Sequence, residues 1–248
     1  MTLRDLRRAL TQGRRVLFPT SLRLVLERTP EWREVEEEWL SQKQAFGLQT
    51  EDADILQLGC GDGRLLFLLL GGDHPARRAT GIRTLIGSKT LINWPMEDRL
   101  GRIQIHDEIA YLDAFDPASF DLIICDDLEN VFCLDGLEDR LDRLYSLLRP
   151  GGEAVLTVQC ANTTGTGGFG VLTASSWIMM FMRAGFEPAN VMRLPTAVDR
   201  EAMEQTTGDA QSLRLHLLRP WEAWELERLR TTDEAVDASA SKKTKKKA

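Results

Sequence analysis

The sequence has little of what marks membrane, disulfide-rich or nucleic-acid-binding proteins. Apolar runs such as Leu65–Leu70 are far shorter than the roughly 20 residues that a membrane-spanning helix needs. The four cysteines form no Cys-X-X-Cys pair and have no histidine at the spacing of a metal site; they are Cys60, Cys125, Cys133 and Cys160. The formal net charge of −7 disfavours the surface as a whole for binding nucleic acid. We therefore expect reduced core thiols, no metal site, no membrane span and a cytoplasmic location.

Two segments are basic although the chain as a whole carries a net negative charge. The arginine-rich start of the chain is typical of either an organelle transit peptide or an N-terminal helical cap, and its helical apolar pattern through Leu17, Leu22 and Val25 favours the cap. At the other end, Lys242–Lys247 predicts a disordered tail. Two interpretations of the tail remain open: a solvated segment without a specific partner, and a contact with nucleic acid.

The order of apolar and polar segments in the rest of the chain indicates one α/β domain. We expect a helical extension or cap over residues 1–47, a folded domain over 48–230 and the Lys-rich tail over 231–248. From residue 53, short apolar runs alternate with helical segments, which is typical of a Rossmann-like, mostly parallel sheet with helices on both faces. The expected strands lie at 53–58, 79–82, 102–106, 121–125, 153–159, 190–194 and 213–218, and the main helices at 63–70, 85–93, 135–148 and 173–184.

Helix boundaries are marked by local signals. Thr29-Pro30-Glu31 is a start signal, with Thr as N-cap and Pro in the first turn, and Trp32, Val35 and Trp39 then recur at helical spacing. This apolar stripe predicts packing against the main domain. Arg149-Pro150-Gly151-Gly152 predicts a helix end with a basic last turn.

Three alternating glycines follow the first apolar strand of the domain, at positions 59, 61 and 63. Glycine tolerates positive φ and has no Cβ, so such a turn lets the backbone approach a nucleotide closely. The apolar helix that follows would point its first N–H groups into the same crevice. A second glycine-rich segment, residues 160–170, follows a later strand and is expected to line that crevice.

These segments together resemble the class I S-adenosylmethionine-dependent methyltransferases. The resemblance rests on Gly59–Gly63, on Ser119–Ile124 and on Leu147–Gly152, in the order of the family, with weaker support from Ala184–Phe186. It implies a seven-stranded Rossmann-like fold and S-adenosylmethionine as cofactor. A nicotinamide fingerprint is disfavoured because Arg64 stands where G-x-G-x-x-G needs its third glycine.

The resemblance also implies where the cofactor lies. The methionine end would lie over the glycine turn, formed by Gly59, Cys60, Gly61, Asp62 and Gly63. Gln57 stands in place of the acid of the first strand, so the negative charge there is lost. Arg83 stands in place of the acid that holds the ribose, and arginine cannot accept a hydrogen bond. Asp107 is the candidate for the adenine, with a surface acid in a turn as the equal alternative.

Asp126 follows the fourth strand, where the family places residues that face the transferred methyl group. Neighbouring carboxylates raise one another's pKa, so Asp126 and Asp127 are candidates for a catalytic base, with Asp126 preferred, and both also suit a solvated strand end. The leading hypothesis is a methyltransferase acting on a small molecule, with the N-terminal helices and residues 160–182 as its lid. The alternatives are an inactive binding or scaffold protein, an RNA or protein methyltransferase recruited by the tail, and an NADP-dependent oxidoreductase. The acceptor, the methylated atom and the oligomeric state stay open.

Overall fold

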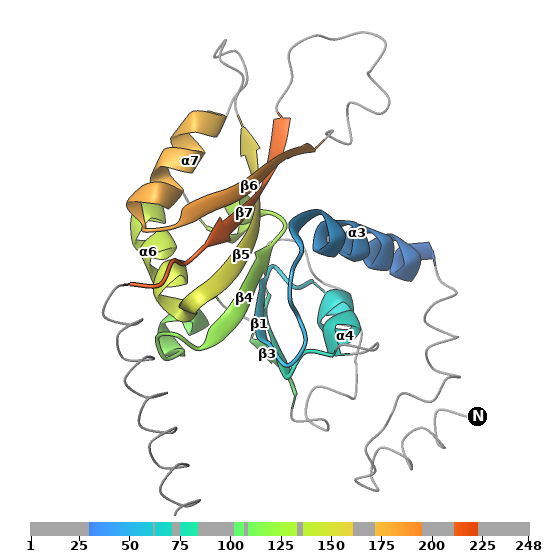
Figure 1. The fold of residues 1–248 in the computed structure, drawn as a ribbon. Helices are drawn as coiled ribbons and strands as arrows, with labels where there is room; N and C mark the ends of the chain where they lie inside the picture. The colour runs from blue at the N-terminus through green and yellow to red at the C-terminus, as the bar shows by residue number, and fades with distance from the viewer. Residues whose placement is uncertain are drawn as a thin grey trace, which may run out of the picture.

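The computed structural model describes residues 30–61, 63–70, 75–83, 102–106, 109–132, 136–160, 172–194 and 211–222. They form a seven-stranded sheet with the strand order β3-β2-β1-β4-β5-β7-β6 (Figure 1). The strands are β1 (Asp54–Leu58), β2 (Arg78–Ile82), β3 (Ile103–His106), β4 (Phe120–Cys125), β5 (Leu148–Cys160), β6 (Glu187–Leu194) and β7 (Gln211–Leu218). Only β7 runs antiparallel to its neighbours, β5 and β6. The expected mostly parallel, Rossmann-like sheet is confirmed.

Helices cover both faces of this sheet, also as expected. On one side lie α3 (Pro30–Phe46) and α4 (Arg64–Leu70), and on the other α6 (Leu137–Leu147) and α7 (Ala174–Arg183) (Figure 1). The short α5 (Leu128–Val131) and the 3-10 helix η1 (Ile109–Ala114) complete the set. Each face has its own apolar core, one including Trp39, Leu66 and Ile55, the other Leu141, Trp177 and Leu56.

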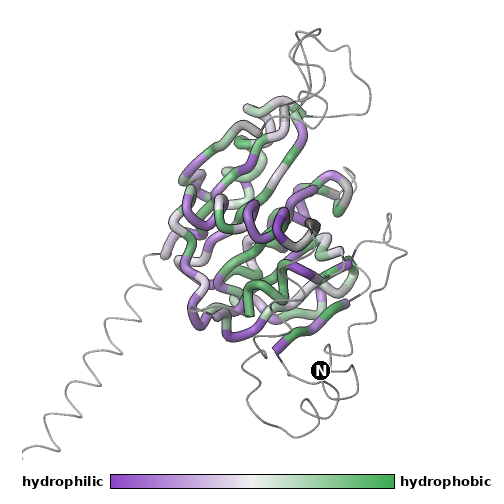
Figure 2. Tube along the Cα trace, turned by 90° about the vertical axis from the view of Figure 1, so that its right-hand side faces the viewer, coloured by the Kyte–Doolittle hydropathy of each residue, from purple (hydrophilic) through white to green (hydrophobic). Residues whose placement is uncertain are grey.

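Hydrophobic periodicity explains most of these elements. Every residue of β1 is buried, as in a central parallel strand covered on both faces. In α6 the buried residues recur every three or four positions, at Leu137, Leu141, Leu144 and Leu147. Figure 2, in which the Cα trace is coloured by hydropathy, shows many of the hydrophobic stretches in the middle of the fold. Within the described residues, no helix is long and apolar enough to cross a membrane.

The prediction for Arg149-Pro150-Gly151-Gly152 is wrong in one respect. Helix α6 ends at Leu147 and β5 begins directly at Leu148, so Arg149 lies in an irregular strand segment and not in a last helical turn. Gly151 has a φ of +76°, and a Cβ there would lie 2.5 Å from Nε1 of Trp221. The glycine therefore serves the contact with the C-terminal segment.

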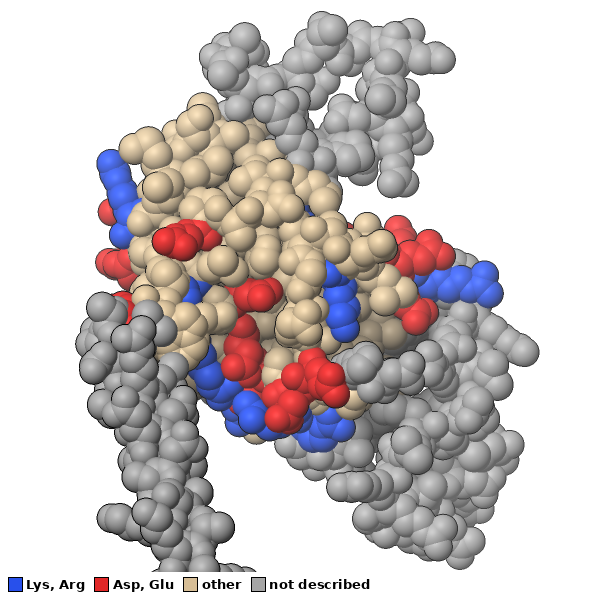
Figure 3. All heavy atoms as spheres, in the orientation of Figure 1, with Lys and Arg blue, Asp and Glu red and all other residues tan. Residues whose placement is uncertain are grey.

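Arg149 instead belongs to a charged cluster at the amino ends of the central strands. The buried Asp54 carboxylate accepts from Arg77 Nη2 at 2.7 Å and from Arg149 Nη2 at 2.8 Å. Asp121 accepts from the backbone N–H of Asp54 at 2.7 Å and also binds Arg149. Figure 3 shows acidic and basic side chains interspersed along this lower edge. We call this group the Asp54 cluster.

The buried cysteines agree with the expectation of reduced core thiols. Cys125 and Cys160 are free and buried, and Cys60 is buried as well. Burial raises the pKa of Cys160 to about 11, so its thiol is protonated and unreactive at neutral pH. Several expected features lie outside the described residues, and the expectations for them stay predictions. They are Cys133, the helix at 85–93, the glycine-rich segment after Cys160, residues 1–29 and the Lys-rich tail.

Candidate functional site

The glycine turn joins β1 to α4 with the geometry that its sequence requires. Gly59, Gly61 and Gly63 have φ values of +68°, +54° and +82°, in the left-handed region that favours glycine. Cys60 donates from its backbone N–H to Ile82 O at 3.0 Å, and Gly63 donates to Cys60 O at 2.8 Å. The turn is thereby fixed against the end of β2.

Strand β2 can approach this turn because it carries a glycine as well. A Cβ on Gly81 would lie 2.6 Å from both Cys60 Sγ and Leu66 Cδ1. Contacts of that length are not tolerated between a Cβ and its neighbours, so a side chain at 81 would force Cys60 and Leu66 to shift.

A cavity of about 120 Å³ lies between this turn and α3. Its lining combines one face of α3 with the turn, the first residues of α4 and the end of β4: Val35, Glu38, Trp39, Gln42, Gln57, Cys60, Arg64, Leu65 and Asp126. Ligand pockets for whole drug-sized molecules measure roughly 300–1,000 Å³, so this cavity suits one polar end of a nucleotide-sized ligand. The segments that follow β2, β3 and β5 lie outside the described residues.

Gln57 faces this cavity from β1 with an unsatisfied acceptor. Its side chain is 6% exposed, and its Oε1 has no hydrogen-bond partner within the described part of the chain. Leaving a buried acceptor unpaired costs about 1–3 kcal/mol, so such an atom is a candidate for binding a donor from a ligand.

Asp126 lies at the end of β4, on the rim of the same cavity, with 45% of its side chain exposed. Crowding by protein atoms raises its pKa above the ordinary value, and the charge of Glu38 acts in the same direction. The guanidinium of Arg214 and a hydrogen bond with Gln42 oppose this shift. The carboxylate is therefore a better proton acceptor than an ordinary surface aspartate.

Arg214 is a residue of this site that the sequence analysis missed. It projects from β7, is 7% exposed, and donates from Nη2 to Glu38 Oε1 at 2.7 Å and from Nε to Thr157 Oγ1 at 3.0 Å. Its Nη2 lies 3.5 Å from Asp126 Oδ1. With its amide oriented to satisfy both groups, Gln42 accepts from Arg214 at 3.0 and 3.2 Å. Little in the sequence signals this role, because an arginine between Leu213 and Leu215 also suits the solvent-facing side of an alternating strand.

The other predicted site residues divide into two groups. Gly59, Cys60, Gly61 and Gly63 form the turn, and Arg83 directly follows β2, where the ribose acid was expected. Asp62 and Asp107 lie outside the described residues. Within the described residues, no group of three or more His, Cys, Asp or Glu side chains could hold a metal ion.

The residues present fit S-adenosylmethionine at one end and differ from the family at the other. Arg64, Gln57 Oε1 and Asp126 offer the cavity a cation and two acceptors, which match the carboxylate and ammonium of an amino acid. Arg83 offers only donors, so the usual acceptance of two ribose hydroxyls has no counterpart at that position.

Comparison with known proteins gives the class of fold. No protein-family model matches the sequence, and no curated protein matches it. Among solved structures, the [4+2]-cyclase SpnF has a TM-score of 0.56 at 15% identity over 77% of this chain and 81% of that one. A Listeria monocytogenes protein assigned as an S-adenosylmethionine-dependent methyltransferase has a TM-score of 0.54 at 15% identity, over 75% and 98%.

A third similar structure is Haemonchus contortus phosphoethanolamine N-methyltransferase 2 with phosphomonomethylethanolamine and S-adenosylhomocysteine, with a TM-score of 0.56 at 14% identity. It covers 75% of this chain and 53% of that one. This chain has the fold of the class I S-adenosylmethionine-dependent methyltransferases. Because SpnF is a cyclase, the shared fold does not by itself define the reaction.

Proposed function

We propose that the chain is an S-adenosylmethionine-dependent methyltransferase that acts on a small-molecule acceptor. The observation that carries the proposal is the cavity over the glycine turn, where Arg64 lies with the acceptor groups of Gln57 and Asp126. S-adenosylmethionine ends in an amino acid, whose carboxylate suits Arg64 and whose ammonium suits the two acceptors. The glycine turn leaves room for the remainder of the cofactor beside it.

When bound, S-adenosylmethionine supplies a methyl group on a positively charged sulfur for in-line transfer to oxygen, nitrogen or carbon. The residues of this chain contribute mainly by position: the glycine turn and Gln57 orient one reactant, and α3 shields the site from water. Asp126 lies on the rim, where it can take a proton from a protonated acceptor, and its raised pKa suits that role.

Calorimetric titration of the full chain with S-adenosylhomocysteine tests the proposal before any acceptor is known. We expect saturable binding at one site per chain and a raised melting temperature with excess ligand. No heat and no thermal shift at millimolar S-adenosylhomocysteine would contradict the proposal. Stabilisation by NADPH in the same assay would instead support a nucleotide-dependent oxidoreductase.

A second candidate function is ligand binding or scaffolding without catalysis. Arg83 favours it, since a donor at the ribose position weakens the usual hold on the cofactor. Binding of S-adenosylhomocysteine combined with no methyl transfer from labelled S-adenosylmethionine to small amines, phenols and thiols supports this candidate.

The basic tail leaves an RNA or protein acceptor as a further alternative. If RNA is bound through Lys242–Lys247, deletion of residues 241–248 should weaken RNA binding and flatten its dependence on salt. Unchanged affinity and salt dependence would exclude the tail as the RNA anchor.

A further inference from the structure

The strand end beside the glycine turn lacks a negative charge. Gln57 is a neutral amide, it is 6% exposed, and its Oε1 lies buried at the cavity without a partner in the described residues. An amide oxygen can accept from an ammonium group but does not balance its charge. Because Coulomb interactions are strong in a partly dehydrated cavity, a cationic ligand group needs a carboxylate nearby.

Besides that of Asp126, a second carboxylate reaches the same cavity from α3. Glu38 lies on the helix face formed by Val35, Trp39 and Gln42, whose other members are apolar or buried. A glutamate on the inward stripe of an amphipathic helix breaks the pattern of that helix. Its neighbours Glu34 and Glu37 are exposed, as Glu38 is, but they line no part of the cavity.

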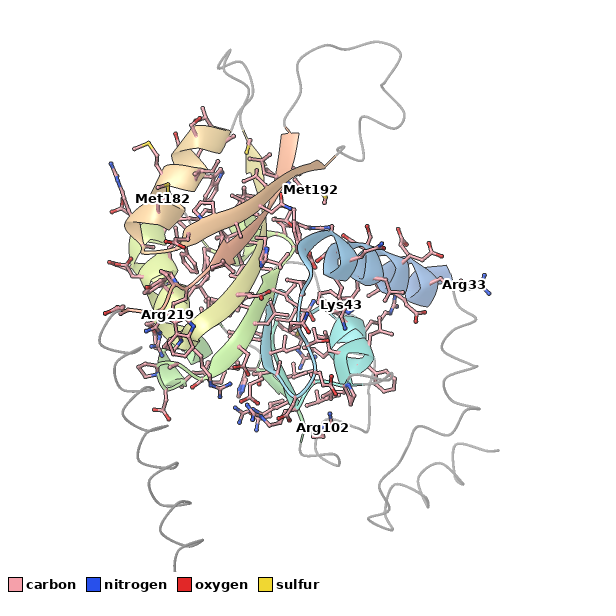
Figure 4. All side chains as sticks on the ribbon, viewed as in Figure 1. Arg33, Lys43, Arg102, Met182, Met192 and Arg219 are labelled. Carbon is pink, nitrogen blue, oxygen red and sulfur yellow. The ribbon has the colours of Figure 1, made fainter. Side chains whose placement is uncertain are left out.

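Glu38 is held in place by contacts from outside its own helix. Its Oε1 accepts from the buried guanidinium of Arg214 at 2.7 Å. The helix itself is anchored by the 7% exposed Trp39 and by a ring contact of 5.3 Å between Phe46 and His216. Lys43, labelled in Figure 4, donates to Thr50 Oγ1 at 2.9 Å. The position of the carboxylate is therefore set by the fold.

The charges around the cavity leave room for a cation. Glu38 and Asp126 share the single guanidinium of Arg214, at 2.7 and 3.5 Å. These three groups together carry one net negative charge when both acids are ionised, and Arg64, which also lines the cavity, brings the total to zero, so the lining suits the zwitterionic end of an amino acid. One ammonium group placed between the acids and Gln57 Oε1 would make those three groups neutral and give the unsatisfied oxygen a donor.

We propose that Glu38 supplies the carboxylate that the first strand lacks and binds the ammonium group of the ligand's amino-acid end. The inference rests on the proposed function, since it takes the ligand to be S-adenosylmethionine or its product. The carboxylate expected on the first strand is thus supplied by α3 in this chain. Helix α3 is then part of the ligand site as well as its cover.

Calorimetry with two ligands tests this proposal. S-adenosylhomocysteine carries the amino acid, whereas 5′-methylthioadenosine keeps the nucleoside and sulfur without it. Glu38→Gln keeps an acceptor for Arg214 and removes only the charge. We expect it to weaken S-adenosylhomocysteine about tenfold, a moderate loss because Glu38 is 53% exposed, and to leave 5′-methylthioadenosine unchanged.

Two further variants make the test specific. Glu37→Gln removes the same charge from the exposed face of α3 and should leave both affinities at the wild-type values. Gln57→Glu in the Glu38→Gln background returns a carboxylate to the first strand and should restore the affinity for S-adenosylhomocysteine. The proposal is overturned if Glu38→Gln loses affinity for S-adenosylhomocysteine, the double variant does not regain it, and both variants still bind 5′-methylthioadenosine.

The outcomes separate this inference from the proposed function. If the wild type binds both ligands and Glu38→Gln behaves like the wild type, Glu38 has no role in binding and the proposed function still stands. If the wild type binds neither ligand, the proposed function and the role of Glu38 both fail.

Discussion

The two ends of strand β1 use polar residues in opposite ways. At the amino end, the carboxylate of Asp54 is buried and fully paired within the Asp54 cluster. At the carboxyl end, three residues along, Gln57 has a buried oxygen without a partner in the described residues, and Asp126 beside it carries a raised pKa. The first arrangement stabilises the fold, and the second leaves interactions for a ligand to complete.

The pKa values of the two acids express the same contrast. Burial alone would raise the pKa of Asp54, but hydrogen bonds from Arg77 and Arg149 and the charge of Arg78 bring it below the ordinary value. For Asp126 the effect of desolvation prevails over the opposing charge of Arg214, a guanidinium that also binds Glu38. A paired carboxylate adds stability, whereas an incompletely paired one lowers it.

Among variants at the two ends of β1, we expect Asp54→Asn to have the largest effect on stability. The variant removes the charge that Arg77 and Arg149 share, and hydrogen bonds to charged groups contribute about 1.5–3 kcal/mol each. We expect the free energy of unfolding to fall by about 2–3 kcal/mol, measured by urea denaturation at pH 7. Affinity for S-adenosylhomocysteine should stay unchanged in the folded fraction, and a selective loss of affinity would contradict a purely structural role.

A smaller loss is expected from Gly59→Ala at the other end of the strand. The φ of +68° at position 59 is disfavoured for a residue with a Cβ, at a cost of about 1–2 kcal/mol. Because strain in the turn moves its N–H groups, we expect affinity for S-adenosylhomocysteine to fall more than stability does. Gly47→Ala, at φ +65° and outside the cavity, is the matched control and should lower stability without changing the affinity.

Asp126→Asn should change stability in the opposite direction. Ionisation of Asp126 opposes folding, so the neutral amide is expected to raise the free energy of unfolding at pH 7 by a few tenths to about 1 kcal/mol. The range is small because 45% exposure lets solvent screen the charge. Methyl transfer to a protonated acceptor should fall in the same variant, and unchanged turnover would remove Asp126 as the base.

The smallest effects should appear in the pH dependence of stability. The folded pKa of Asp54 lies below 3.8, so its contribution is present above that pH and is lost as the pH falls through the folded value. The folded pKa of Asp126 lies above 3.8, so protonation stabilises the native state at low pH, and this contribution is lost as the pH rises through the folded value. Differences in unfolding free energy between wild type and each asparagine variant, measured from pH 3 to 7, should therefore slope in opposite directions; parallel slopes would contradict the contrast.

Much of the fold could be predicted because its signals are local. The strand at 53–58, the glycine turn and the helix at 63–70 each depend on the order of apolar residues and glycines within a few positions, and all three are confirmed. The segment at Arg149 was misread because Pro and two glycines also suit an irregular strand, and its contact with Asp54 joins residues 95 positions apart.

The candidate site was less accessible to sequence reasoning. Cys60 and the glycines of the turn could be found by motif, and Asp126 by its place after the fourth strand. Glu38 and Arg214 belong to no motif, and each looks like an ordinary surface charge until β7 and α3 are placed in space. Their relation depends on the antiparallel insertion of β7 between β5 and β6, which no local pattern reveals.

That late insertion of β7 also has a consequence for the order of folding. The pair Glu38 and Arg214 spans 176 positions, so α3 and β7 can meet only after the chain has been made through Arg214. Contacts of such sequence separation form late and slowly compared with the local turn around Gly59. During synthesis, the glycine turn can form well before β7 is made, so the acids beside the turn gain their guanidinium only in a later step.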